Sequence, residues 1–209
     1  MTLRETLRAW LPEQVHFGIK DPTQHYPLLG SEPKAVENAI EKRQTEFSAG
    51  RAAARLALRS MGLPACEIPV GHRRAPIWPF GVTGSITHSK SLCIALVAYQ
   101  QNVASLGIDA EPNVPLKPEL RRAILHEAEM DVSAERAIAL FSMKEALFKT
   151  LFPITQEWMG FHAAKSVGDS VLELTAAFGV FEKGHRFDVP TLKVEGHVIS
   201  FCSLEGGRI

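Results

Sequence analysis

Apolar side chains recur at helical spacing in two long segments of the chain. In residues 35–61 they predict one helix, which Gly62 would end. Residues 134–152 repeat the pattern, with Ser133 as the expected N-cap and Pro153 just beyond the last turn. The two segments therefore predict two long helices, each with one face in a core.

Other segments alternate in the manner of strands. Residues 85–100 indicate a strand, a turn and a second strand, and residues 104–111 alternate until Pro112 stops them. The C-terminal quarter is predicted as strands, with a hairpin turn at Glu195-Gly196. Residues 114–120 are expected to be a linker.

A helix followed by strands thus occurs once in each half of the chain. The 209 residues suffice for one large domain or two small ones. We therefore predict an α+β protein of two halves, residues 1–104 and 105–209.

Charge and cysteine content narrow the possible functions. Lys plus Arg and Asp plus Glu both number 23, so the net charge is zero and nucleic acid is not an expected partner. Cys66, Cys93 and Cys202 have neither zinc-ligand spacing nor a disulfide pattern. No signal peptide is recognisable, and no apolar run approaches the roughly 20 residues of a membrane span. We expect a cytoplasmic protein whose anion sites are local.

Asp109 and Glu111 lie two residues apart on the strand predicted at 104–111. Their carboxylates therefore point to the same face. Two carboxylates this close repel each other unless a cation lies between them or one is protonated, and oxygen ligands suit Mg²⁺. The alternative is a solvated strand end, which is common at a sheet surface.

The second predicted helix carries a carboxylate on its apolar stripe. Glu145 shares this stripe with Ile138, Phe141, Phe148 and Phe152. A carboxylate there is costly unless it is paired or binds a metal. Lys149 lies one turn further along, whereas Lys144 is expected to project toward the polar side. The alternative is a surface ion pair between Glu145 and Lys149.

Basic residues gather in the first half. The candidates for binding an anion are Arg51, Arg55, Arg59, Arg73, Arg74, Thr87 and His88. Guanidinium, hydroxyl and imidazole groups suit phosphate oxygens. The alternative is a solvated basic face, which we prefer for Arg59, and a lone histidine such as His88 is more often structural than a ligand.

Four segments in order carry a family resemblance: KRQTEFSAGRAAARLAL, RRAPIWPFGVTGSITHS, LGIDAEP and FSMKEALFK. Together they resemble the 4'-phosphopantetheinyl transferases of the two-lobed Sfp/EntD-like group, in particular the enterobactin-synthetase type. The resemblance runs from about Lys42 to Pro153. Thr87 stands where the family often has Ser, Ala110 where a larger aliphatic is common, and Phe141 where many members have Trp.

The resemblance implies two similar α+β lobes with pseudo-twofold symmetry, which hold coenzyme A in a cleft between them. It implies Mg²⁺-dependent transfer of phosphopantetheine from coenzyme A to a serine of an apo acyl or peptidyl carrier protein, with release of adenosine 3',5'-bisphosphate. Asp109, Glu111 and Glu145 would be metal ligands, although the role of Glu111 stays open. Glu145 would also take the serine proton, directly or through water, and Lys149 would contact the phosphates.

The same resemblance implies the coenzyme A contacts. Arg51, Arg73 and His88 would bind its phosphates, with Arg55, Arg74 and Thr87 as weaker candidates. Two lobes in one chain predict a monomer. The motifs lean toward siderophore biosynthesis, but fatty-acid and polyketide carriers remain open.

Two other functions compete with this one. A Mg²⁺-dependent nucleotidyl or phosphotransferase is disfavoured, because the sequence contains no P-loop or other Gly-rich phosphate cradle. A non-catalytic module that binds coenzyme A or a carrier protein would have no need of Glu145 or Lys149, yet both are present.

Overall fold

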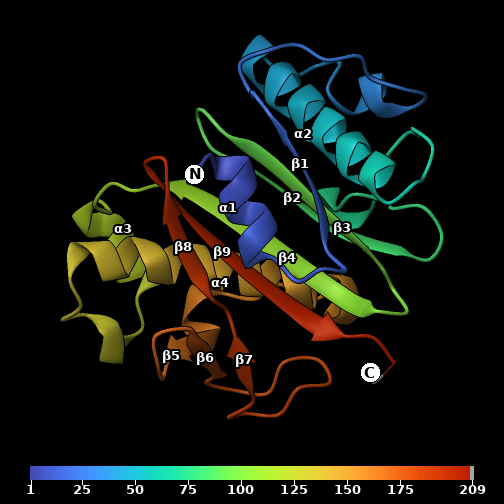
Figure 1. The fold of residues 1–209 in the computed structure, drawn as a ribbon. Helices are drawn as coiled ribbons and strands as arrows, with labels where there is room; N and C mark the ends of the chain where they lie inside the picture. The colour runs from blue at the N-terminus through green and yellow to red at the C-terminus, as the bar shows by residue number, and fades with distance from the viewer. Residues whose placement is uncertain (208–209) are drawn as a thin grey trace. The chain divides into compact units, whose positions relative to one another are not determined.

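Helices mix with three small sheets in residues 1–207, the part of the chain that the computed structural model describes (Figure 1). This confirms the prediction of a mixed helix-and-sheet protein. The chain divides into unit 1, Met1–Leu106 with the segment from Leu204 onward, and unit 2, Gly107–Ser203. Residues 208–209, the end of the predicted C-terminal half, lie outside the described residues.

Unit 1 places one long helix against a three-stranded sheet. Its elements are α1 (Leu3–Trp10), β1 (His16–Lys20), η1 (Glu32–Ala35), α2 (Glu41–Ser60), η2 (His72–Arg74), β2 (Val82–His88) and β3 (Cys93–Tyr99). The sheet is antiparallel with the order β1-β3-β2. The β2–β3 pair is the predicted strand-turn-strand. The helix α1 was not predicted, although Thr2 and Glu5 form a capping box at its start.

The long helix of unit 1 begins later than predicted. Residues 35–40 lie outside it, because η1 ends at Ala35 and Ile40 has extended backbone as the N-cap of α2. Val36 is buried while Ile40 is 74% exposed, so the two residues do not share a core-facing stripe. Their helical spacing was therefore coincidental.

Small residues allow α2 to lie close to β1. Ala49, Ala53 and Ala57 are fully buried on the helix face that meets the sheet. A Cβ added to Gly18 of β1 would lie 2.1 Å from the carbonyl oxygen of Ala53, which is far inside van der Waals contact. Only glycine permits this approach of helix backbone to strand.

We therefore expect Gly18→Ala to destabilise the protein by about 1–3 kcal/mol, through the overpacking that it forces between α2 and β1. Urea unfolding followed by circular dichroism measures this change. Gly160→Ala is the matched control, since a Cβ at Gly160 meets nothing within 4 Å. Equal midpoints for the two variants would contradict this account of the packing.

Unit 2 combines a second long helix with two small sheets. Its elements are β4 (Val103–Pro112), α3 (Pro118–Ile124), η3 (Glu127–Glu129), α4 (Ala134–Thr155), η4 (Phe161–Ala163), β5 (Ala164–Ser166), β6 (Val171–Leu174), β7 (Arg186–Asp188), β8 (Thr191–Val194) and β9 (His197–Glu205). The first residues of β4, up to Leu106, and the last of β9, from Leu204, belong to unit 1. The sheets have the orders β4-β9-β8 and β5-β6-β7. The predicted linker is wrong from Pro118 onward, where α3 begins with a proline in its first turn.

Two local predictions in unit 2 are confirmed. Glu195 and Gly196 have φ angles of 46° and 74° between β8 and β9, as a two-residue turn with both central residues left-handed requires. The hydroxyl of Ser133 accepts a hydrogen bond from Arg136 N at the start of α4. The end of α4 was predicted too early, since the helix continues through Pro153 to Thr155. In residues 1–207, no helix is both long enough and apolar enough to cross a bilayer.

Candidate active site

The face of β4 that carries the predicted carboxylates points toward α4. A Cβ on Gly107 would lie 2.1 Å from the carbonyl oxygen of Ala146 on α4. Because side chains alternate along a strand, Asp109 and Glu111 share the face of Gly107. The prediction that the two carboxylates point the same way is confirmed, but this face is covered by a helix and is not a solvated strand end.

Asp109 forms a buried ion pair with Lys149. Lys149 Nζ lies 2.7 Å from Asp109 Oδ1 and also donates to the carbonyl oxygen of Ile108 at 3.1 Å. Asp109 is only 3% exposed. This ion pair therefore joins β4 to α4 at two of the residues that were predicted to form the active site.

Glu111 and Glu145 are half-buried, and neither makes a hydrogen bond or ion pair with any residue of the described chain. Burial raises the pKa of the Glu111 carboxyl to about 7, with Asp109 and Glu145 adding to the rise and Lys149 opposing it. Burial also raises the pKa of Glu145, where Lys149 opposes the shift and Asp109 adds to it. The alternative interpretation, a surface ion pair between Glu145 and Lys149, is thus excluded for residues 1–207. The charge of Lys149 therefore acts on all three carboxylates, those of Asp109, Glu111 and Glu145.

This donor set fits a divalent cation in its chemistry. Within residues 1–207, no group of three or more His, Cys, Asp or Glu side chains is arranged to hold a metal ion. Mg²⁺, however, is usually held by one or two carboxylates together with water and substrate oxygens. Carboxylates that have lost water without gaining a partner are the groups that a cation would stabilise.

The stripe of α4 that contains Glu145 is only partly buried: Ile138 and Phe152 are buried, as predicted, but the middle of the stripe is not. The core face is formed by Leu140, Met143, Ala146, Leu147 and Thr150, all fully buried. Phe141, Glu145 and Phe148 are half-buried beside it. Phe141 packs on Phe161 and Phe148 on Trp158, with ring centroids 5.6 Å and 5.0 Å apart. Glu145 therefore lies at the border of the core, between two aromatic contacts.

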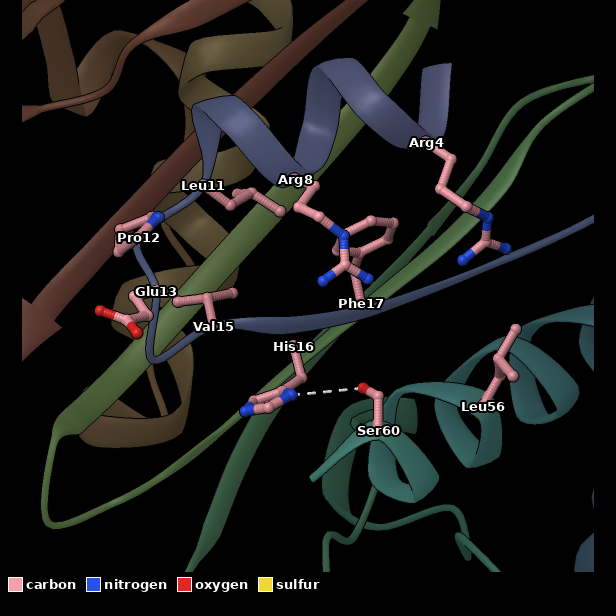
Figure 2. Close-up of a pocket in the computed structure, with 10 residues that line it drawn as sticks. All are labelled: Arg4, Arg8, Leu11, Pro12, Glu13, Val15, His16, Phe17, Leu56 and Ser60. Atoms are coloured by element: carbon pink, nitrogen blue, oxygen red, sulfur yellow. Dashed lines mark hydrogen bonds between the residues drawn. The ribbon is translucent and has the colours of Figure 1, made fainter. Parts of the chain in front are cut away.

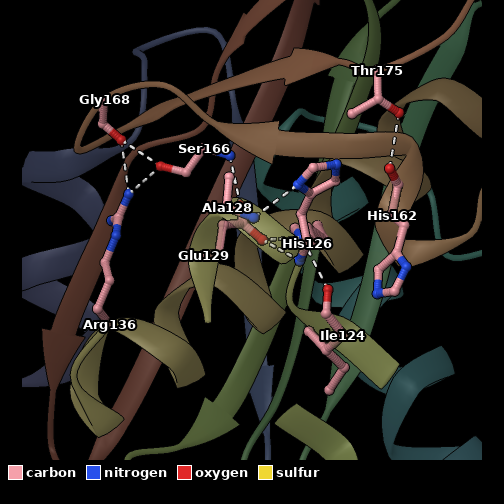
Figure 3. Close-up of polar contacts among 10 residues, drawn as sticks. Ile124, His126, Ala128, Glu129, Arg136, His162, Ser166, Gly168 and Thr175 are labelled. Carbon is pink, nitrogen blue, oxygen red and sulfur yellow. Dashed lines mark hydrogen bonds and ion pairs between the residues drawn. The ribbon is translucent and has the colours of Figure 1, made fainter. Parts of the chain in front are cut away.

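The prediction for Lys144 is wrong. Its side chain is 1% exposed, and its ammonium donates to Glu129 Oε2 at 2.6 Å and to the carbonyl oxygen of Ile124 at 2.9 Å. Glu129 also accepts from the backbone N–H of His126 at 2.7 Å and of Ser166 at 2.6 Å (Figure 3). The buried carboxylate thus ties η3, α4 and β5 together.

In unit 1, Arg51 is a buried cation that lacks an anionic partner. It is 5% exposed, and its guanidinium lies 4.2 Å from the ring centroid of Phe47. Among the described residues it makes no hydrogen bond or ion pair, and its Nε is buried. Burial lowers the pKa of Arg51 to about 10, with Glu32 opposing and Arg43 and Arg55 adding to the effect. An unpaired buried guanidinium is a ready partner for an anion.

His88 lies on the same side of the sheet as α2. Arg43 Nη1 is 3.0 Å from His88 Nε2, and a Cβ on Gly50 would touch Ile86, which shares the face of His88. Thr87 is buried and points to the opposite face. The structure therefore brings His88 to α2 and does not bring Thr87 there. Arg43 was missed, although it precedes Arg51 by two helical turns on the same i,i+4 row.

Arg55 is taken up by an internal ion pair, so it is withdrawn from the phosphate-binding candidates. Its Nη1 lies 2.8 Å and 2.9 Å from the two carboxylate oxygens of Glu32, and its Nη2 donates to the carbonyl oxygen of Pro27. Glu32 also accepts from the backbone N–H of Leu29 and Ile68. The pair holds the segment before α2 against the helix. Arg59 is exposed, as expected for a solvated face.

Arg73 and Arg74 are exposed on a strained loop. Their φ angles are 48° and 67°, a region that residues other than glycine rarely adopt. They are the last two residues of η2, which lies between Gly71 and Ala75. Such strain is more common at functional loops than elsewhere. The loop presents both side chains to solvent.

Comparison with known proteins gives two family matches. Residues 31–98 match the 4'-phosphopantetheinyl transferase N-terminal domain, and residues 105–202 match the 4'-phosphopantetheinyl transferase superfamily. Together the two matches contain all four segments that carry the resemblance.

Individual relatives agree with these matches. The 4'-phosphopantetheinyl transferase Npt of Nocardia iowensis is 39% identical over 144 residues, which cover 64% of this chain and 63% of the relative. PptT of Mycobacterium tuberculosis is 36% identical over 151 residues, with coverage of 69% and 66%. Enterobactin synthase component D of Escherichia coli K12 is 37% identical over 123 residues, with coverage of 54% and 57%. The chain thus spans less than two thirds of the length of these relatives.

Proposed function

Because the chain belongs to the 4'-phosphopantetheinyl transferase superfamily, we propose that it transfers 4'-phosphopantetheine from coenzyme A to a serine of an apo acyl or peptidyl carrier protein. The second product is adenosine 3',5'-bisphosphate. The proposal rests on the family together with the side chains that the fold gathers in each unit.

The observation that carries the proposal is the carboxylate cluster between β4 and α4. Asp109 is paired with Lys149, while Glu111 and Glu145 are half-buried and have no hydrogen-bond or ion-pair partner among the described residues 1–207. A binding module has no use for such a costly arrangement. Transfer of a phosphate-linked group depends on positioned charges of this kind, because charge must be neutralised while the reacting groups are held in line.

Asp109, Glu111 and Glu145 would hold Mg²⁺ in this proposal. Bound there, the ion supplies charge neutralisation for the pyrophosphate oxygens of coenzyme A. Lys149 stays close to Asp109 and contributes a positive charge on the same side of α4. The phosphates of coenzyme A would be bound by Arg51, His88 and Arg73 of unit 1, with Arg43 and Arg74 as further candidates.

The chain's own residues then act on the reacting atoms. Glu145 takes the proton from the carrier serine hydroxyl, directly or through a water molecule. The serine oxygen forms a bond to the phosphorus that bears pantetheine, and the bond from that phosphorus to the bridging oxygen breaks. The electron pair leaves with adenosine 3',5'-bisphosphate, whose developing charge Lys149 steadies. The raised pKa of Glu145 fits a proton acceptor.

We also propose that the two units are similar lobes, as pseudo-twofold symmetry requires. The sheets β1-β3-β2 and β4-β9-β8 have the same strand order. In each sheet the strand that comes last in the chain lies in the middle, between the strand that comes first and the strand that precedes it in the chain. Each first strand carries a glycine, Gly18 or Gly107, against the backbone of the long helix that follows. The same order and the same close approach support a repeated lobe.

We propose that the protein is located in the cytoplasm and is a monomer. Cys66, Cys93 and Cys202 are all free thiols, which fits a reducing compartment. A single chain supplies both sets of site residues. The carrier is proposed to belong to siderophore synthesis, on the likeness to enterobactin synthase component D.

The direct test is to incubate the protein with coenzyme A, Mg²⁺ and an apo-carrier protein, and then to weigh the carrier. We expect the carrier to gain the mass of one phosphopantetheine only when all components are present. If coenzyme A binds but no carrier gains mass, the chain is a binding module and the proposed activity is wrong.

The same assay tests the anion site of unit 1. Arg51→Met keeps the packing on Phe47 and removes a charge-assisted contact, so the KM for coenzyme A should rise about 10- to 100-fold. Without coenzyme A the variant should unfold no earlier than wild type, because an unpaired buried charge has been removed. Arg59→Met, the same change at an exposed position of α2, should leave KM unaltered. If the KM for coenzyme A were unchanged in Arg51→Met, Arg51 would not bind coenzyme A and its role would be structural.

A further inference from the structure

A cavity of about 430 Å³ opens in unit 1 among α1, β1 and the C-terminal end of α2 (Figure 2). It shares no residue with the proposed coenzyme A contacts. Its polar lining includes Arg4 and Arg8 of α1, His16 of β1 and Ser60 of α2. The volume lies in the range typical of pockets for small ligands.

Two guanidinium groups are held over one aromatic ring at this cavity. The Cζ atoms of Arg4 and Arg8 lie 5.8 Å and 6.0 Å from the ring centroid of the buried Phe17. Figure 2 shows both side chains reaching from α1 toward the strand that carries Phe17. A cation near an aromatic face is attracted by the ring quadrupole, which favours this placement of each guanidinium.

No carboxylate neutralises this pair. Among residues 1–207, neither Arg4 nor Arg8 makes an ion pair or hydrogen bond. The carboxylate of Glu5 is engaged with the backbone N–H of Thr2 at 2.8 Å. Glu13 also lines the cavity but pairs with neither arginine. Two like charges over one ring repel each other, and an anion between them would relieve that repulsion.

His16 and Ser60 add two further polar groups. His16 Nδ1 and Ser60 Oγ share a hydrogen bond of 3.3 Å across the gap between β1 and α2. The positive charge of Arg8 helps to lower the pKa of the His16 imidazole, after burial as the first cause and against a backbone hydrogen bond of Ser60, which raises it. The imidazole and Arg8 therefore belong to one electrostatic site.

We propose that this cavity is a second anion site, which binds a small phosphomonoester or free phosphate through Arg4 and Arg8, with His16 and Ser60 at its side. Guanidinium forks match phosphate oxygens in two-point contacts. The ligand is small, because the cavity has the volume of a compact molecule. The site is separate from the proposed transfer reaction and does not depend on it.

Nuclear magnetic resonance of the full ¹⁵N-labelled chain tests the site directly. Inorganic phosphate is added in one titration and glycerol 3-phosphate in a second. Sodium chloride keeps the ionic strength constant, and a titration with sodium chloride alone is the control. We expect saturable shifts of the His16 ring signals and of the Arg4 and Arg8 Nε–H signals. Bound phosphate should also raise the pKa of His16, since it adds negative charge beside the imidazole. A stronger response to glycerol 3-phosphate identifies the ester as the ligand, and an equal response identifies the phosphate group itself.

Arg4→Gln/Arg8→Gln should weaken the response at His16 about tenfold or more, because the charge-assisted contacts are lost. Glutamine keeps the long stems and the helix, and the rest of the spectrum reports whether the fold is intact; Arg8→Gln alone serves if the double variant is not folded. Arg59→Gln removes one charge from the same unit and should respond like wild type. The proposal is overturned if the His16 signals of the wild type do not respond to either phosphate compound, or if the double variant responds as strongly as the wild type.

Discussion

Glu145→Gln should reduce the turnover of the carrier-modification reaction by about 10³-fold, since removal of a general base typically costs about 10²–10⁴. The substitution keeps the shape of the side chain and removes its charge. In the proposed mechanism it withdraws both a metal ligand and the acceptor of the serine proton. The loss should appear in kcat, measured by weighing the carrier over time at saturating coenzyme A and Mg²⁺.

The same variant should be at least as stable as wild type when Mg²⁺ and coenzyme A are absent. Glu145 is half-buried, has no hydrogen bond or ion pair in residues 1–207, and has a raised pKa because burial disfavours its charge. Its ionised form therefore opposes folding above the ordinary pKa of a glutamate, and glutamine removes that cost. Mg²⁺ and coenzyme A added together should raise the melting temperature of wild type far more than that of the variant.

Glu135→Gln is the matched control on the same helix. Glu135 lies in the first turn of α4, where it is exposed and pairs with Lys193 at 2.7 Å. It should keep wild-type turnover and the full stabilisation by ligands. If Glu145→Gln retained turnover, or gained as much stability from Mg²⁺ and coenzyme A as wild type, the catalytic assignment of Glu145 would be wrong.

Features that depend on local chemistry could be predicted from the sequence. The turn at Glu195-Gly196 needs two residues with positive φ, and the start of α4 needs a capping hydroxyl at Ser133; both signals are contained in a few neighbouring residues. The alternation of β4 likewise predicted that Asp109 and Glu111 share a face. Each of these features is decided within one turn or one strand.

Features that depend on distant partners could not be predicted in this way. Arg55 lies on the same row of α2 as Arg51, yet Glu32, 23 residues earlier in the chain, pairs with it. Nothing in the spacing along α2 separates the paired arginine from the unpaired one. Periodicity also placed Lys144 on the polar side of α4. A lysine is rarely buried unless a carboxylate pairs with it, and here that carboxylate lies in a different element, which periodicity along α4 cannot reveal.

That partner makes Lys144→Met the substitution with the largest expected effect on stability. Lys144 and Glu129 are both almost completely buried, with 2.6 Å between Nζ and Oε2. Methionine fills much of the space but leaves the carboxylate of Glu129 buried with only its two backbone donors, His126 and Ser166. Breaking one side of a buried ion pair typically costs about 3–5 kcal/mol. Urea unfolding of the variant should show a loss of this size.

Lys165→Met provides the comparison. Lys165 pairs with Glu173 at 3.6 Å, but its side chain is 37% exposed, so the same substitution in the same unit should cost less than about 1 kcal/mol. Adding Glu129→Gln to Lys144→Met should cost less than the sum of the two single changes, because the variant then contains neither an uncompensated carboxylate nor an uncompensated ammonium. A loss in Lys144→Met no larger than that in Lys165→Met would mean that the pair does not hold η3, α4 and β5 together. The segment before Glu145 would then owe its position to apolar packing alone.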